Sequence, residues 1–226
     1  MKKSKLIPLT ITDYRKRFIE GRTHEQIQAT YEKAWESKNF EISNYWKRAT
    51  YFWAFQIASF AGYFSVIDSE EYKIHPQILY FVNCIGFVTA LAWLLSNRGS
   101  KGWQRNWEQH VDLLEDNITG PLYKTIRSHN TYSVSRLNEL VSGFIIGIWS
   151  ILFLKYYDDK IEFNAAAKID YQILFATLIL ISISVSMIFF YGRGHNKVEV
   201  LNNLKDEEMK SDNPIVFYYR VGITEN

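Results

Sequence analysis

The sequence predicts an all-α integral membrane protein with four transmembrane helices, helical extensions into the cytoplasm and a short C-terminal strand. The first observation behind this prediction is a set of four apolar runs, each near the roughly 17 to 25 residues that a helix needs to cross a hydrocarbon core. The runs are 49–67, 78–95, 140–157 and 173–191. Lys155 is the only charged residue in them, and from its place near the end of the third run it can snorkel to the interface.

The second observation is the distribution of positive charge. The chain has 26 Lys and Arg residues, and all but Lys73, Lys155, Lys160 and Lys168 lie before the first run, between the second and third, or after the fourth. Because loops rich in Lys and Arg stay on the cytoplasmic side, both termini and the central connection are predicted to be cytoplasmic. The predicted segments are an N-terminal helical segment (1–48), a first transmembrane hairpin (49–96), a cytoplasmic helical connection (97–139), a second hairpin (140–191) and a cytoplasmic tail (192–226).

The N-terminal segment carries the start signal of a long helix. Thr23 is followed three residues later by Gln26, which is the spacing of a capping box. No Pro or Gly follows until Gly62, so the helix is expected to continue from the cytoplasm into the first span. In the tail, the β-branched and aromatic residues of "NPIVFYYRVGI" predict a strand, which we expect to dock on a neighbouring subunit.

The central connection begins with "NRGSKGWQRNWEQHVDLLEDN", residues 97–117. Two lines of side chains follow helical spacing in this stretch, one apolar and one acidic. The apolar line is Trp103, Trp107, Val111 and Leu114, and the acidic line is Glu108, Asp112, Glu115 and Asp116. The apolar line is predicted to pack on the N-terminal helix, whose Arg and Lys residues would face the acidic line.

An alternative role for this stretch is a metal or acid–base site formed by His110 with Glu108 or Asp112. Each carboxylate is two residues from His110, and side chains two apart on a helix point in different directions. The sequence also lacks the common nucleotide-binding, hydrolase and zinc motifs. We therefore expect no enzyme activity, no catalytic residues, and no bound metal or cofactor.

The net charge bears on the class of partner, and the cysteine content bears on disulfide formation. The formal net charge of +2 comes without a basic stripe interleaved with aromatics, which disfavours nucleic acid. The single cysteine, Cys84, lies in an apolar run and excludes an intramolecular disulfide. The lipid bilayer is the partner that the composition predicts.

Small residues in two runs suggest how helices associate. Ala54, Ala58 and Gly62 recur every four residues in the first run, and Gly143 and Gly147 do so in the third. Such spacing allows close backbone approach, either within one chain or between chains. Asn83, in the second run, is interpreted as an interhelical hydrogen-bonding residue, with a polar pore contact as the alternative.

Two stretches at the membrane–cytoplasm junctions resemble a known family. "FEISNYWKRATYFWAF", residues 40–55, and "NRGSKGWQRNWEQHVDLLED", residues 97–116, are similar to segments of the RipA family of octameric membrane proteins. The resemblance implies a homo-oligomer, an octamer, of the bacterial cytoplasmic (inner) membrane, with cytoplasmic termini and no assigned catalytic residues. The hypothesis is a multi-pass protein with a structural or scaffolding role. The alternative is an oligomeric channel, transporter or membrane effector gated from the cytoplasmic side.

Overall fold

The computed structural model describes residues 5–69, 77–125, 132–160 and 215–221, together with the single positions 175, 179, 182, 184 and 186. Most of the predicted fourth span, 173–191, therefore lies outside the described residues. The chain forms two compact units. The bundle unit comprises Glu36–Glu108 and Arg127–Gly192, and the terminal unit comprises Met1–Trp35, Gln109–Ile126 and Arg193–Asn226.

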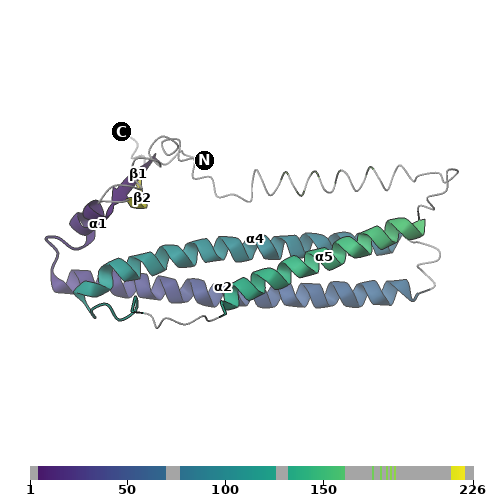
Figure 1. Cartoon of the computed structure of the whole chain (residues 1–226), viewed down its shortest axis with the longest axis horizontal. Helices are drawn as coiled ribbons and strands as arrows, with labels where there is room; N and C mark the ends of the chain where they lie inside the picture. Colours follow the sequence, from purple (N-terminus) through teal and green to yellow (C-terminus); the bar gives the residue numbers. More distant parts are fainter. Residues whose placement is uncertain are drawn as a thin grey trace. The chain divides into compact units, whose positions relative to one another are not determined.

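The bundle unit is built on three long helices that lie alongside one another (Figure 1). They are α2 (His24–Ile67), α4 (Gln77–Leu114) and α5 (Val134–Lys160), and the first two run on into the terminal unit. The predicted start of α2 is confirmed, because the Thr23 N–H donates to Gln26 Oε1 at 3.2 Å and the Gln26 N–H donates to Thr23 Oγ1 at 3.3 Å. Its uninterrupted course from the polar segment into the first apolar run is also confirmed.

The buried positions of the bundle recur at intervals of eleven residues. Examples are Tyr45 and Gln56 on α2, Leu79 and Ala90 on α4, and Asn138 and Trp149, then Ile145 and Tyr156, on α5. Eleven residues make three turns of ~3.67 residues, close to the natural period of the α-helix. The helices can therefore keep one face toward their neighbours with little supercoiling.

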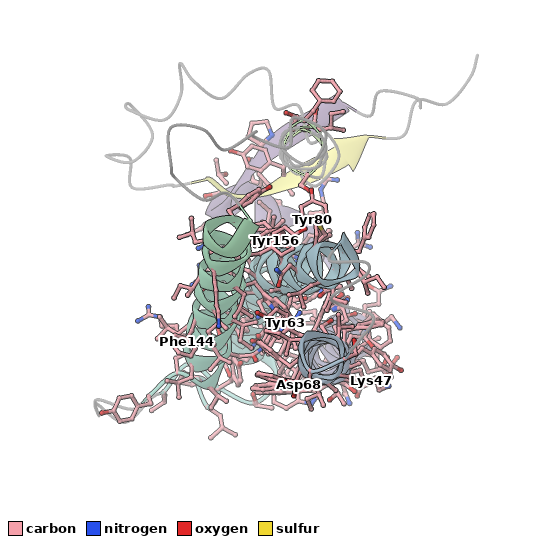
Figure 2. All side chains as sticks on the ribbon, turned by 90° about the vertical axis from the view of Figure 1, so that its right-hand side faces the viewer. Lys47, Tyr63, Asp68, Tyr80, Phe144 and Tyr156 are labelled. Carbon is pink, nitrogen blue, oxygen red and sulfur yellow. The ribbon has the colours of Figure 1, made fainter. Side chains whose placement is uncertain are left out.

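Aromatic rings fill much of the space between these helices. Figure 2, which looks along the bundle, shows Tyr63 between α2 and α5, and Tyr156 between α5 and α4. Both belong to a buried cluster that also includes Trp93 and Trp149. The outer surface carries large apolar side chains as well, and Phe144 on α5 is 70% exposed. Exposed apolar side chains of this size are typical of a surface that contacts a membrane or another protein.

Two of the described helices are long and apolar enough to cross a membrane. They are Ile78–Asn117 and Val134–Tyr157, which contain the predicted second and third spans. The predicted first span lies in α2, whose apolar run also contains Gln56 and several Tyr, Trp and Ser residues. These side chains lower the mean hydropathy of the run, so α2 is not among the helices that are apolar enough to cross a membrane by composition alone.

The terminal unit combines both ends of the chain. Strand β1 (Lys5–Thr10) pairs antiparallel with β2 (Ile215–Val221), and α1 (Ile11–Phe18) follows β1 directly. The predicted C-terminal strand is confirmed, and it pairs with β1 of the same chain, whereas its docking on a neighbouring subunit stays a prediction. Figure 1 shows the two strands next to each other.

Candidate functional site

The terminal unit is organised around a contact between Tyr14 on α1 and His110 near the end of α4. Their hydroxyl oxygen and Nδ1 lie 2.9 Å apart. The His110 ring stacks on Phe217 of β2, with centroids 4.0 Å apart and planes at 18°. Tyr14 also contacts Phe217 and is fully buried. Three distant segments of sequence therefore meet at one hydrogen bond and one stack.

Burial controls the protonation of this pair. Desolvation lowers the pKa of His110 to about 4 and raises the pKa of Tyr14 above its usual value. At neutral pH the imidazole is therefore uncharged, and it shares a hydrogen bond with the Tyr14 hydroxyl whose direction depends on the imidazole tautomer. The contact that the structure shows at His110 Nδ1 is with Tyr14, and the alternative pairing of His110 with Glu108 or Asp112 stays untested.

Glu115 closes the turn that follows α4. Its side chain is fully buried, and its two carboxylate oxygens accept the backbone N–H groups of Tyr123 at 2.7 Å and Lys124 at 3.0 Å. The Lys124 ammonium lies 2.5 Å from Asp116. Glu115, a member of the acidic line, thus holds the loop that follows α4. The prediction that the acidic line faces the N-terminal basic residues did not include this contact.

A buried polar network joins the three helices of the bundle unit where their apolar runs meet polar sequence. Asn138 Nδ2 on α5 donates to the Tyr45 hydroxyl at 2.8 Å and to Asn97 Oδ1 at 3.1 Å. Asn97 Nδ2 then donates to Ser142 Oγ at 3.5 Å. Buried polar groups that are hydrogen-bonded to one another favour one register of the helices. The network was not predicted from the sequence, because its members lie at or beyond the ends of the apolar runs.

A second polar contact lies deeper among the apolar residues. Gln56 on α2 is buried, accepts the Trp149 indole N–H at 2.7 Å and donates to Thr89 Oγ1 at 2.8 Å. Its amide nitrogen also lies 3.3 Å from the Gly86 carbonyl. One side chain thus satisfies groups on both α4 and α5.

Asn83 differs from Gln56. It is fully buried, yet neither its amide oxygen nor its amide nitrogen has a hydrogen-bond partner in the described part of the chain. The interhelical hydrogen bond predicted for Asn83 is therefore not seen there, and Gln56 has that role. Complete burial also removes Asn83 from the protein surface, where a ring of symmetry-related pore contacts would have to lie.

The apolar line predicted on 103–114 divides into buried and exposed members. Val111 and Leu114 are fully buried in a cluster with Tyr14, Ala34 and Phe217. Trp107 is half-buried, whereas Trp103 is 53% exposed. The predicted buried face is therefore seen for Val111 and Leu114, which reach the core of the terminal unit, and not for Trp103.

The predicted small residues make few close contacts among the three described helices. A Cβ added at Gly143 or Gly147 would meet no atom of the described residues within 4 Å, whereas one at Gly62 would be in ordinary contact with Val82 at 3.9 Å. Ala54 and Ala58 are exposed. Close packing depends instead on Gly86, where a Cβ would overlap the Trp149 indole. Gly86 and Ala90 are four residues apart, a spacing that could have identified this contact.

The described residues contain no group of three or more His, Cys, Asp or Glu side chains placed to hold a metal ion. The described residues of each unit form buried contacts that join distant parts of the chain. Such contacts position helices and termini relative to one another within each unit, and the chemistry they support is packing and hydrogen bonding.

A comparison with protein families agrees with this architecture. The family model of the octameric membrane protein family (8xMP) matches residues 28–157, which contain most of α2, all of α4 and most of α5. No curated protein and no solved structure matches the chain significantly. Because the match covers more than half of the 226 residues, this chain belongs to the octameric membrane protein family.

Proposed function

We propose that the protein is a homo-octameric, four-span scaffold of the bacterial cytoplasmic membrane, with both termini and the central connection in the cytoplasm. Its role is structural, and it acts through assembly and not through catalysis. Membership of an octameric membrane protein family supports the oligomer. The topology rests on one observation in the terminal unit.

That observation is the joining of three segments in one compact body. Tyr14 of α1 contacts His110, Phe217 of β2 contacts both Tyr14 and His110, and β1 pairs with β2. Because these segments share one core, they lie on the same side of a membrane. The chain must then cross the membrane an even number of times between Tyr14 and His110, and again between His110 and Phe217.

The requirement for an even number of crossings supports the first and fourth spans, which composition alone does not establish. The apolar part of α4 gives one crossing before His110, so α2 is the element that supplies the other. After His110, α5 gives one crossing, and the apolar run 173–191 is the remaining segment of sufficient length before β2. This reasoning supports four spans, and the positive-inside rule supports a cytoplasmic terminal unit.

A scaffold fits the bundle better than a channel does. The buried polar side chains Gln56, Asn97 and Asn138 bond to neighbouring helices within one chain. Large apolar residues cover much of the outer surface of α4 and α5, which suits contact with lipid. A water-filled path would need polar side chains lining it, and Gln56, Asn97 and Asn138 are occupied in joining helices.

Reporter fusions test the topology. Fusions at Glu71 and Asn164 are expected to report the outer side, and fusions at Lys124 and at the C-terminus are expected to report the cytoplasm. A Lys124 fusion that reports the outer side would contradict the four-span arrangement. The particle mass in mild detergent, measured by native mass spectrometry, tests the octamer. An electron microscopy reconstruction with a hydrated path along the symmetry axis would favour a channel instead.

A further inference from the structure

One outward face of α2 differs from the outward faces of α4 and α5. A row of small residues, three or four positions apart, lies on the side of α2 opposite its buried residues. The row consists of Thr50, Ala54, Ala58, Ala61 and Ser65, all of them exposed. The Thr50 hydroxyl donates to the Trp46 carbonyl at 3.0 Å, so this polar group is satisfied within the helix.

The corresponding faces of α4 and α5 carry large side chains. Phe81 and Ile85 are exposed on α4, and Phe144, Ile151 and Leu154 are exposed on α5. Each of these faces also has one exposed small residue within its apolar run, Ala92 on α4 and Gly147 on α5. Large apolar side chains are well accommodated by lipid tails. Small residues contribute to stability in a membrane chiefly by letting another helix approach closely. The face of α2 is therefore suited to a helix, whereas those of α4 and α5 are suited to lipid.

The row is bounded by bulky residues, which gives it the form of a shallow groove. At 100° per residue, Tyr51 and Phe55 fall on one side of the row, and Ile57 and Phe64 fall on the other. All four are more than half exposed. A helix lying on the small residues would contact these side chains on both flanks.

We propose that this face of α2 is the surface on which the next copy of the chain docks. The inference rests on the proposed homo-octamer and identifies the surface that forms it. Each subunit of a closed ring presents two surfaces, one to each neighbour, and the small-residue face of α2 is suited to be one of them because it favours helix packing. Membership of the octameric family points to a second copy as the occupant.

The test is a bulky substitution on this face with a matched control on α4. Ala58→Phe places a large ring on the row, and Ala92→Phe places the same ring at an exposed alanine of α4. Ala58→Ser keeps the residue small. Native mass spectrometry in mild detergent gives the particle mass, and circular dichroism with thermal melting reports whether each variant is folded.

Wild-type protein, Ala92→Phe and Ala58→Ser are expected to give the mass of eight chains. Ala58→Phe is expected to keep its helix content but to lose most of the octamer at the same protein concentration. An Ala58→Phe particle of unchanged mass would overturn the docking proposal alone. If that particle also melted at a lower temperature, the chain's own residues 173–191 would be the occupant of the face. A monomeric wild-type protein would contradict the proposed octamer, and this inference with it.

Discussion

The Tyr14 hydroxyl and His110 Nδ1 lie 2.9 Å apart, although the two residues are 96 positions apart in the sequence. This contact links the helix that follows the N-terminal strand to the last turns of α4. Phe217 stacks on the same imidazole and adds the C-terminal strand. A membrane protein whose termini are held in this way presents one folded unit and not two free tails.

Acid is expected to weaken this unit. The pKa of His110 is lowered by burial to about 4, from an ordinary value of 6.5, so the unfolded state binds more protons between these pH values. The stability that the neutral imidazole contributes is present above pH 6.5 and is lost as the pH falls toward 4. Hydrogen exchange of the β2 amides, corrected for the intrinsic effect of pH, should show falling protection from pH 7 to pH 5.

His110→Phe is the control for this pH dependence. The variant keeps an aromatic ring for stacking on Phe217 but has no group that titrates in this range. Its β2 protection should vary much less with pH than that of the wild type. Identical pH profiles for the two proteins would mean that His110 is not the group responsible.

The core of the terminal unit gives a prediction about the apolar line on α4. Leu114 is fully buried and Trp103 is more than half exposed. Leu114→Ala should lower the free energy of unfolding by about 2 to 5 kcal/mol, because it removes buried methyl groups and leaves a cavity. Trp103→Ala should cost much less in detergent, despite removing the larger side chain. Thermal melting of both variants would check this order, and a larger loss for Trp103→Ala would contradict it.

The sequence revealed those features that depend on local chemistry. Thr23 and Gln26 mark the start of α2 because capping needs only neighbouring residues, and helical spacing placed Val111 and Leu114 on a buried face. Strand β2 was evident from its β-branched and aromatic residues. Its partner β1 was not predicted, because that strand is short and contains Pro8, which is unfavourable inside a sheet.

Contacts between distant residues were the features that the sequence could not supply. The sequence shows that Gly86 and Gly143 are both glycines within apolar runs. Only the position of the Trp149 indole shows that Gly86 has no room for a side chain. In the same way, Asn83 and Gln56 were both visible as polar residues in spans. Their different roles depend on which groups of the neighbouring helices lie within reach.

The contrast between Gln56 and Asn83 can be measured. Gln56→Leu removes an acceptor from the Trp149 N–H and leaves it buried without that partner, which costs about 1 to 3 kcal/mol. Asn83→Leu instead replaces an amide that has no hydrogen bond within the described residues by an apolar group of similar size. It should leave the melting temperature unchanged or raise it, whereas Gln56→Leu should lower it. A strong loss of stability in Asn83→Leu would show that the amide has a partner among the remaining residues of the chain.

The last prediction concerns the closest approach of α4 and α5. A Cβ at position 86 would overlap the Trp149 ring, so Gly86→Ala forces either the indole or a helix to move. Overpacking of this kind typically costs about 1 to 3 kcal/mol. The cost should be larger here than for Gly147→Ala, where the added methyl group meets no atom of the described part of the chain within 4 Å. Melting temperatures of the two variants, measured side by side in the same detergent, give the comparison.

A second substitution tests whether the Trp149 ring is the cause. Trp149→Leu alone should destabilise the bundle, because it empties a buried site and removes the N–H that donates to Gln56. If the clash is with the indole, adding Gly86→Ala to Trp149→Leu should cost less than adding it to the wild type. The difference is the coupling energy of a double-mutant cycle. Equal costs in the two backgrounds would place the strain of Gly86→Ala somewhere other than the Trp149 ring.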